Sequence, residues 1–356
     1  MSVTTEPGLL GPQITLFAHA LRLHQQHPDG VLPRNGEPYP DADRHRARPS
    51  TRRAEDVAAI LDRHFGQPDA PASDLVDAFH DVDVPIHRND RIAAAALRAD
   101  RQRMRQTGRW LVRHSTDRNA ATVGLALLAA GRAEADIPLI QTIGLLSNRF
   151  GPWAAAALEH RRGGTEALLW LAERVAGWGR VHVVEALCRQ GAASSRAWLL
   201  RHACDGDHLN GYFAGKVATA AHLHEAITSP DADDDLIDHT GRLLRTMTEC
   251  QGMSMTLEHY PPAPAVLTAH AAHLARQPPT ANRYVDAAII ADRLLAEPPE
   301  RCGCTAEQRD RIAQQYLAVL NRPDWRAAVR SGLGPTSDFF AWFTSHVAAR
   351  LRLGAG

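Results

Sequence analysis

The sequence predicts an all-α protein built from stacked antiparallel helix pairs. Three observations support this fold class: a repeat of about 30 residues, apolar residues on one face of each helical segment, and no convincing strand alternation. The repeat is clearest where TEALLWL at residues 165–171 aligns with SRAWLLR at residues 195–201. One helix pair cannot bury its apolar face alone, so neighbouring pairs are expected to stack into a continuous core.

Glycine and aromatic residues mark the breaks between paired helices. These breaks read RFGPW at residues 149–153, GWGRV at 177–181 and LNGYF at 209–213. The pattern of period and helix pairing resembles the HEAT-repeat class of α-solenoids over residues 118–228, with more divergent units to about residue 296. The resemblance implies a solenoid with an extended concave binding surface.

The first 117 residues are expected to form an N-terminal helical region. Its predicted helices carry apolar stripes and cover residues 12–27, 54–65, 74–80 and the chain from Asn89 onward. Gly108 is predicted to divide the last of these, and Pro85 to keep the residues before it extended. Residues 28–52 are rich in Pro, Asp and Arg, which indicates a long loop that is either a mobile connector or a functional lid.

Helical patterns continue to the end of the chain. The acidic residues 231–235 suit a helix N-terminus, where free N–H groups carry partial positive charge. Thr305 is predicted to cap a helix over residues 306–320. A strongly apolar helix over residues 339–351 is expected to cover the end of the stack. We therefore divide the chain into an N-terminal region (1–117), HEAT-like repeats (118–296) and a C-terminal helical cap (297–356).

Charge and composition narrow the class of partner. The 356 residues include 40 Lys or Arg and 40 Asp or Glu, so no net field attracts nucleic acid or an acidic membrane. Lys216 is the only lysine, and a chain rich in Arg and Ala is typical of a GC-rich genome, so we expect a bacterial protein. The N-terminus lacks a signal-peptide pattern, and no apolar run approaches the roughly 20 residues of a membrane span.

The cysteines indicate a reducing compartment. Their number is odd and most lie within helical patterns, at Cys188, Cys204, Cys250, Cys302 and Cys304. We expect a cytoplasmic protein. Cys302 and Cys304 have the chemistry to bind zinc with Cys250 and His259, but two loop cysteines without a role fit the short spacing better. We expect no metal and no cofactor.

Two breaks one repeat apart carry the densest polar groups. The candidate binding residues are Trp178, Arg180 and His182 at the first, and His202, Asp205, Asp207, His208, Asn210 and Tyr212 at the second. Stacking of units is expected to bring the two breaks side by side. In the alternative interpretation the second group only closes a turn, with Asp207 capping the helix that begins near Leu209.

Repeated tryptophans admit two interpretations. On a concave face they would stack on a ligand, whereas between helices they would form core. For Trp170 and Trp198 we predict equivalent, mostly buried positions. Arginines between them, such as Arg189, would contact phosphates if several lined one groove, but intervening glutamates favour a solvated mixed-charge face.

No recognisable catalytic motif accompanies these residues. The sequence contains no nucleotide-binding Gly-rich loop after a strand, no GxSxG turn and no HExxH pair. The first hypothesis is a non-catalytic interaction protein that binds a protein or peptide on its concave face. One alternative resembles the HEAT-like DNA glycosylases, which use Trp, Asp and Arg on that face, although the zero net charge disfavours it. The other is a small-molecule enzyme with a site near residues 202–211, so the sequence leaves catalysis open.

Overall fold

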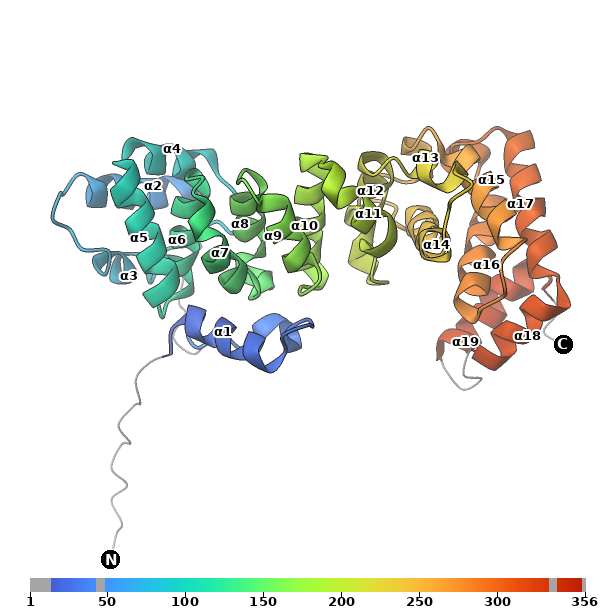
Figure 1. Cartoon of the computed structure of the whole chain (residues 1–356), viewed down its shortest axis with the longest axis horizontal. Helices are drawn as coiled ribbons and strands as arrows, with labels where there is room; N and C mark the ends of the chain where they lie inside the picture. Colours follow the sequence, from blue (N-terminus) through green and yellow to red (C-terminus); the bar gives the residue numbers. More distant parts are fainter. Residues whose placement is uncertain (1–13, 43–48, 333–337, 354–356) are drawn as a thin grey trace, which may run out of the picture. The chain divides into compact units, whose positions relative to one another are not determined.

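The computed structural model describes residues 14–42, 49–332 and 338–353. Throughout these ranges the chain folds into α-helices and short helical turns without a β-strand, so the predicted all-α class is confirmed (Figure 1). None of the helices so described combines the length and the apolar character needed to cross a bilayer. Contacts divide the chain into unit 1 (Met1–Gln190) and unit 2 (Gly191–Gly356). The three-part division expected from the sequence remains a prediction.

Unit 1 is a series of mostly short helices. Their bounds are α1 (Leu16–Gln26), α2 (Arg53–Phe65), α3 (Asp74–Phe79), α4 (Asp90–Arg98), α5 (Arg101–His114), α6 (Arg118–Ala130), α7 (Ile137–Gly144), α8 (Ser147–Glu159), α9 (Gly164–Ala172) and α10 (Gly177–Gln190). Helices α5 and α6, α7 and α8, and α9 and α10 pack as pairs joined by short connections, which makes the members of each pair antiparallel (Figure 1). Across pairs, α6 packs on α8 and α8 on α10, while α7 contacts both α5 and α9. The pairs therefore form two layers.

Glycines allow the closest helix contacts in these layers. A Cβ at Gly108 in α5 would lie 3.1 Å from the Gly124 carbonyl oxygen in α6. The prediction that Gly108 divides the helix is therefore wrong: α5 is continuous, and the break falls at Ala99, before Asp100 caps α5. A Cβ at Gly179 in α10 would lie 2.3 Å from the Ser147 Cβ in α8. Only glycine permits the observed approach of α10 to α8.

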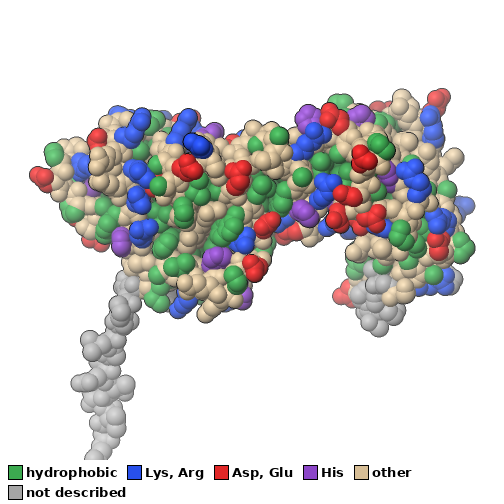
Figure 2. Space-filling model, viewed as in Figure 1, with side chains coloured by type: hydrophobic (Ala, Val, Ile, Leu, Met, Phe, Trp, Pro, Cys, Tyr) green, Lys and Arg blue, Asp and Glu red, His purple; other side chains and the backbone are tan. Residues whose placement is uncertain are grey.

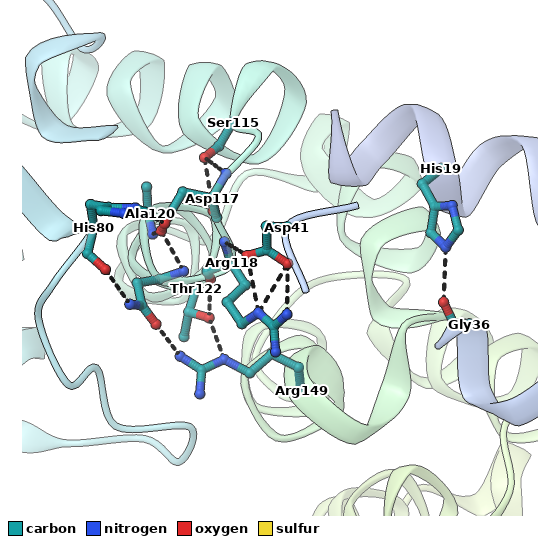
Figure 3. Close-up of polar contacts among 11 residues, drawn as sticks. His19, Gly36, Asp41, His80, Ser115, Asp117, Arg118, Ala120, Thr122 and Arg149 are labelled. Carbon is teal, nitrogen blue, oxygen red and sulfur yellow. Dashed lines mark hydrogen bonds and ion pairs between the residues drawn. The ribbon is translucent and has the colours of Figure 1, made fainter. Parts of the chain in front are cut away.

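The described part of the predicted long loop, residues 28–42, packs against the helices of unit 1, and we call it the strap. Leu32 and Tyr39 are buried, and Asp41 forms an ion pair with Arg118 at 2.8 Å. His19 of α1 lies 2.8 Å from the Gly36 carbonyl oxygen (Figure 3). The strap is thus held by core packing and a buried ion pair, which is not what a mobile connector requires. Residues 43–48 of the same loop lie outside the described residues.

Unit 2 repeats the layered arrangement. Its helices are α11 (Ala193–His202), α12 (Ala214–Ala220), α13 (Leu223–Thr228), α14 (Asp234–Glu249), α15 (Ala263–Leu274), α16 (Ala281–Ala296), α17 (Ala306–Leu320), α18 (Pro323–Gly332) and α19 (Asp338–Trp342). Helices α11, α14, α16 and α18 pack in that order, and α13, α15 and α17 form a second row. A π-helical turn over Phe343–Ala348 follows α19 where one continuous helix was predicted.

Two predicted helix starts in unit 2 are confirmed. Thr305 accepts a hydrogen bond from the Gln308 backbone while the Gln308 side chain accepts one from Thr305, which is a complete capping box. In the acidic run, Asp233 caps α14 by accepting from the Leu236 backbone N–H at 2.8 Å. Both are local contacts, so sequence alone was sufficient to find them.

A candidate binding groove in unit 1

The residues predicted as one site divide between the two units. Trp178, Arg180 and His182 belong to α10 in unit 1, whereas in unit 2 His202 is the last residue of α11 and the other five follow that helix. The expectation that the two breaks lie side by side stays a prediction.

In unit 2, the predicted residues hold a turn together. Asp207 accepts a hydrogen bond from the Leu209 backbone N–H at 2.9 Å and so caps the short 3-10 turn His208–Tyr212. The Asn210 side chain donates to the Asp205 carboxylate at 2.8 Å and accepts from the Asp205 backbone N–H at 2.9 Å. Asn210 is only 2% exposed. These contacts are those that the turn-closing interpretation requires.

The neighbouring histidines of unit 2 also contact protein groups. His208 lies 3.0 Å from the Asp207 carboxylate, and the ring of His202 lies beside Trp198, with centroids 6.4 Å apart. Trp198 and its predicted counterpart Trp170 in unit 1 are both half-buried. Tyr212 is half-buried as well.

The cysteines of unit 2 are poor candidates for a metal site. Burial raises the pKa of Cys302 to about 11, and it also raises the pKa of Cys304 and of Cys250. Metals bind the thiolate, so a raised pKa opposes coordination. Among the described residues no group of three His, Cys, Asp or Glu side chains is placed to hold a metal ion.

In unit 1, Arg180 differs from its two predicted neighbours. Arg180 is buried and donates to the Ala172 carbonyl oxygen at 2.8 Å, so it supports the connection between α9 and α10. Trp178 is 44% exposed, and its ring stacks on that of His182 with centroids 6.2 Å apart. His182 in turn lines a surface groove.

The groove encloses about 480 Å³, a volume typical of binding sites. Three elements line it: the segment before α4, helix α8 with its C-cap, and helix α10. Their lining residues are His87, Arg88, Pro152, Ala155, Ala156, Glu159, His160, His182, Glu185 and Arg189. The apolar members are all small, which leaves the space between α8 and α10 open.

Helical spacing explains the α10 wall of the groove. His182, Glu185 and Arg189 follow Trp178 at intervals of four, three and four residues, so the four side chains share one face. The remaining faces of α10 are buried through Val181, Val183 and other apolar residues. The stripe therefore lies outside the buried core of α10, and its last residue, Arg189, contacts Glu159 of α8.

Tertiary hydrogen bonds position the segment before α4, which forms the third wall of the groove. The indole N–H of Trp153 in α8 donates to the Pro85 carbonyl oxygen at 2.9 Å. Arg149, one turn earlier, donates to the Val84 carbonyl oxygen at 3.4 Å and to the Asn119 side chain at 2.8 Å. Figure 3 shows Arg149 reaching the residues at the start of α6. Because Pro85 is fixed on α8, the two residues that follow Ile86 are delivered to the groove.

The two arginines of the groove have different partners. Arg189 forms two hydrogen bonds with the Glu159 carboxylate, both of 2.9 Å, and these raise the pKa of Arg189. Arg88 donates instead to the His160 ring at 3.4 Å. Within the described ranges Arg88 forms no ion pair with a carboxylate. The charge of the Arg189 guanidinium is therefore balanced by Glu159, whereas no carboxylate balances that of Arg88 among the described residues.

The imidazole of His182 is held neutral. Burial lowers the pKa of His182 to about 4, and the neighbouring His87 contributes to the same shift. The rings of His87 and His182 meet edge to face with centroids 5.1 Å apart. Trp178, His182 and His87 therefore form a continuous row of rings that ends beside Arg88.

Sequence reasoning found only part of this groove. It selected Trp178 and His182, and the 4-3-4 spacing on a largely apolar helix was a usable signal for the rest of the α10 stripe. His87, Arg88 and His160 were missed. No local pattern distinguishes them, because the hydrogen bonds to Pro85 and Val84 place the first two.

Comparison with protein-family models gave no match, and neither did comparison with curated proteins or with solved structures.

Proposed function

We propose that the protein is a non-catalytic binding protein that takes a peptide segment of a partner protein in the groove of unit 1. The layered helix pairs support the further proposal of a HEAT-like α-solenoid, a framework that presents extended surfaces for such partners. The observation that supports the proposal most directly is that Trp178 is 44% exposed while its ring stacks on that of His182. Tryptophans held in a fixed orientation at a surface are prominent among residues that dominate binding energies.

The chemistry of the groove favours binding over catalysis. Its lining contains no serine, threonine or cysteine to act as a nucleophile. Glu159 is engaged by Arg189, and His182 stays neutral far below pH 7, which makes both poor proton-transfer groups.

The charge distribution favours a peptide over nucleic acid. Figure 2 shows basic and acidic side chains intermixed on the visible face. The groove follows the same pattern, with two arginines and two glutamates. A nucleic-acid site is expected to carry a basic excess.

Selection from a random peptide display library on the purified protein tests this proposal. We expect enriched peptides whose affinity falls at least tenfold in Trp178→Ala, the loss typical of a central aromatic contact. Trp342→Ala is the matched control, since Trp342 is 40% exposed in unit 2. Thermal melts of both variants check folding. If no peptide is enriched, or if Trp178→Ala binds like the wild type, the groove does not bind peptides as proposed.

A further inference from the structure

The two arginines of the groove differ in their partners, and this difference indicates the kind of peptide that binds. Arg189 already has a carboxylate partner in Glu159, with both bonds of a two-point contact made. Arg88 is exposed, and its one contact in the groove is a hydrogen bond to His160. Its remaining N–H groups match the geometry of an incoming carboxylate. The Arg189–Glu159 pair thus shows, within the same groove, the arginine–carboxylate contact that Arg88 does not make.

The row of rings from Trp178 to His87 sets the distance between a peptide contact at Trp178 and a second one at Arg88. His182 touches both His87, at 5.1 Å, and Trp178, at 6.2 Å, between ring centroids. Arg88 directly follows His87 in the chain. An extended peptide advances about 3.3 Å per residue, so two to four residues span the row. A side chain stacked on Trp178 and a carboxylate at Arg88 can therefore belong to one short segment.

The remaining acidic residue of the groove lies on another wall. Glu185 is on α10, between His182 and Arg189 along the exposed stripe. It interacts with both of these neighbours through charge. An incoming carboxylate is accordingly favoured on the Arg88 side, where His160 is the adjacent group, and disfavoured along α10.

We propose that the groove recognises an acidic peptide motif, in which an aromatic side chain stacks on Trp178 and an Asp or Glu two to four residues away binds Arg88. This inference rests on the proposed function of the groove and adds the chemical class of its partner. Arg88 provides specificity for the carboxylate, whereas Trp178 provides contact area.

Fluorescence anisotropy with labelled synthetic peptides tests the motif. Each peptide carries one aromatic residue and one Asp two, three or four positions away, and its matched partner carries Asn in place of Asp. We expect the best Asp peptide to bind the wild type about tenfold more tightly than its Asn partner, as for a hydrogen bond between charged groups. Arg88→Gln should abolish that ratio, and Arg88→Lys should retain only part of it because the two-point geometry is lost.

Arg91→Gln is the control, because Arg91 lies three residues further on and pairs with Glu55 outside the groove lining. The ratio should survive in this variant. If Asp and Asn peptides bind the wild type equally but both still need Trp178, the carboxylate motif is wrong while peptide binding stands. If no peptide binds, both proposals are wrong. Tighter binding of a phosphoserine peptide than of the Asp peptide, reversed by inorganic phosphate, would reassign Arg88 to phosphate recognition.

Discussion

The groove of unit 1 and the polar turn of unit 2 look alike in sequence but differ in what their side chains do. In the turn, Asp205, Asp207 and Asn210 direct their hydrogen bonds at one another and at nearby backbone N–H groups. At the groove, by contrast, Arg88 keeps unused donors in its lining, and Trp178 is 44% exposed beside it, next to His182. A dense group of polar residues is therefore weak evidence of a site. Exposed aromatic surface and hydrogen-bond donors that local contacts leave unused are a better indicator of a binding site.

The first way to break this comparison is to change the spacing of α8 and α10, the two helices that line the groove. A Cβ at Gly179 would overlap the Ser147 Cβ at 2.3 Å, so Gly179→Ala should force α8 and α10 apart. We expect a net loss of about 2 kcal/mol in unfolding free energy, since overpacking outweighs the helix propensity gained. Peptide binding should fall as well, because both walls move.

Urea unfolding measures the change, and Gly30→Ala is the control because a Cβ at Gly30 meets no atom within 4 Å. An unchanged midpoint for Gly179→Ala would mean that the close approach of α8 and α10 is not essential. The groove would then need another explanation for its shape.

The second test sharpens the contrast by disrupting the turn. Asn210→Ala removes a buried amide that bonds Asp205 through both its oxygen and its nitrogen. We expect unfolding free energy to fall by about 1–2 kcal/mol, as when a buried partner is deleted. Peptide affinity should stay at the wild-type value.

Trp178→Ala should show the opposite pattern to Asn210→Ala: peptide affinity should fall, while the unfolding free energy should hardly change. Calorimetric titration and urea unfolding on both variants give the two readouts. Binding lost in Asn210→Ala without any loss of stability would move the functional site to unit 2.

Local interactions were predictable from the sequence, and close tertiary contacts were not. The Asp207 cap and the Thr305–Gln308 capping box follow from residues three or fewer positions apart. Gly108 was misjudged because its role depends on Gly124 in the next helix. His87 and Arg88 follow Pro85, which was predicted to keep the residues before it extended, but the Trp153 indole that holds Pro85 is 68 residues away. The helix pattern was thus visible, while the third wall of the groove was not.

The smallest expected effect is a change in how the unfolding free energy depends on pH, and it comes from His182. Burial sets the pKa of His182 at about 4 in the folded protein, whereas an unfolded histidine titrates near 6.5. Between those values the unfolded chain binds the extra proton, so the His182 contribution to stability is fully present above about pH 6.5 and declines toward pH 4. Burial lowers the pKa of His270 in unit 2, which is hydrogen-bonded to Tyr316, to about 3, so His270 adds to the same decline.

His182→Gln should therefore flatten the dependence of unfolding free energy on pH between about 6.5 and 4 without removing it, because His270 still contributes. Urea unfolding at several pH values measures the slope, and NMR of the imidazole carbons locates the midpoint for His182. Peptide binding to the wild type should weaken only as the pH falls to about 4, because His182 of the folded protein takes up its proton there and places a charge between the rings of Trp178 and His87. A midpoint near 6.5 for His182 would mean that its ring is open to water, and Trp178 would then lack the fixed, neutral support on which the proposed contact depends.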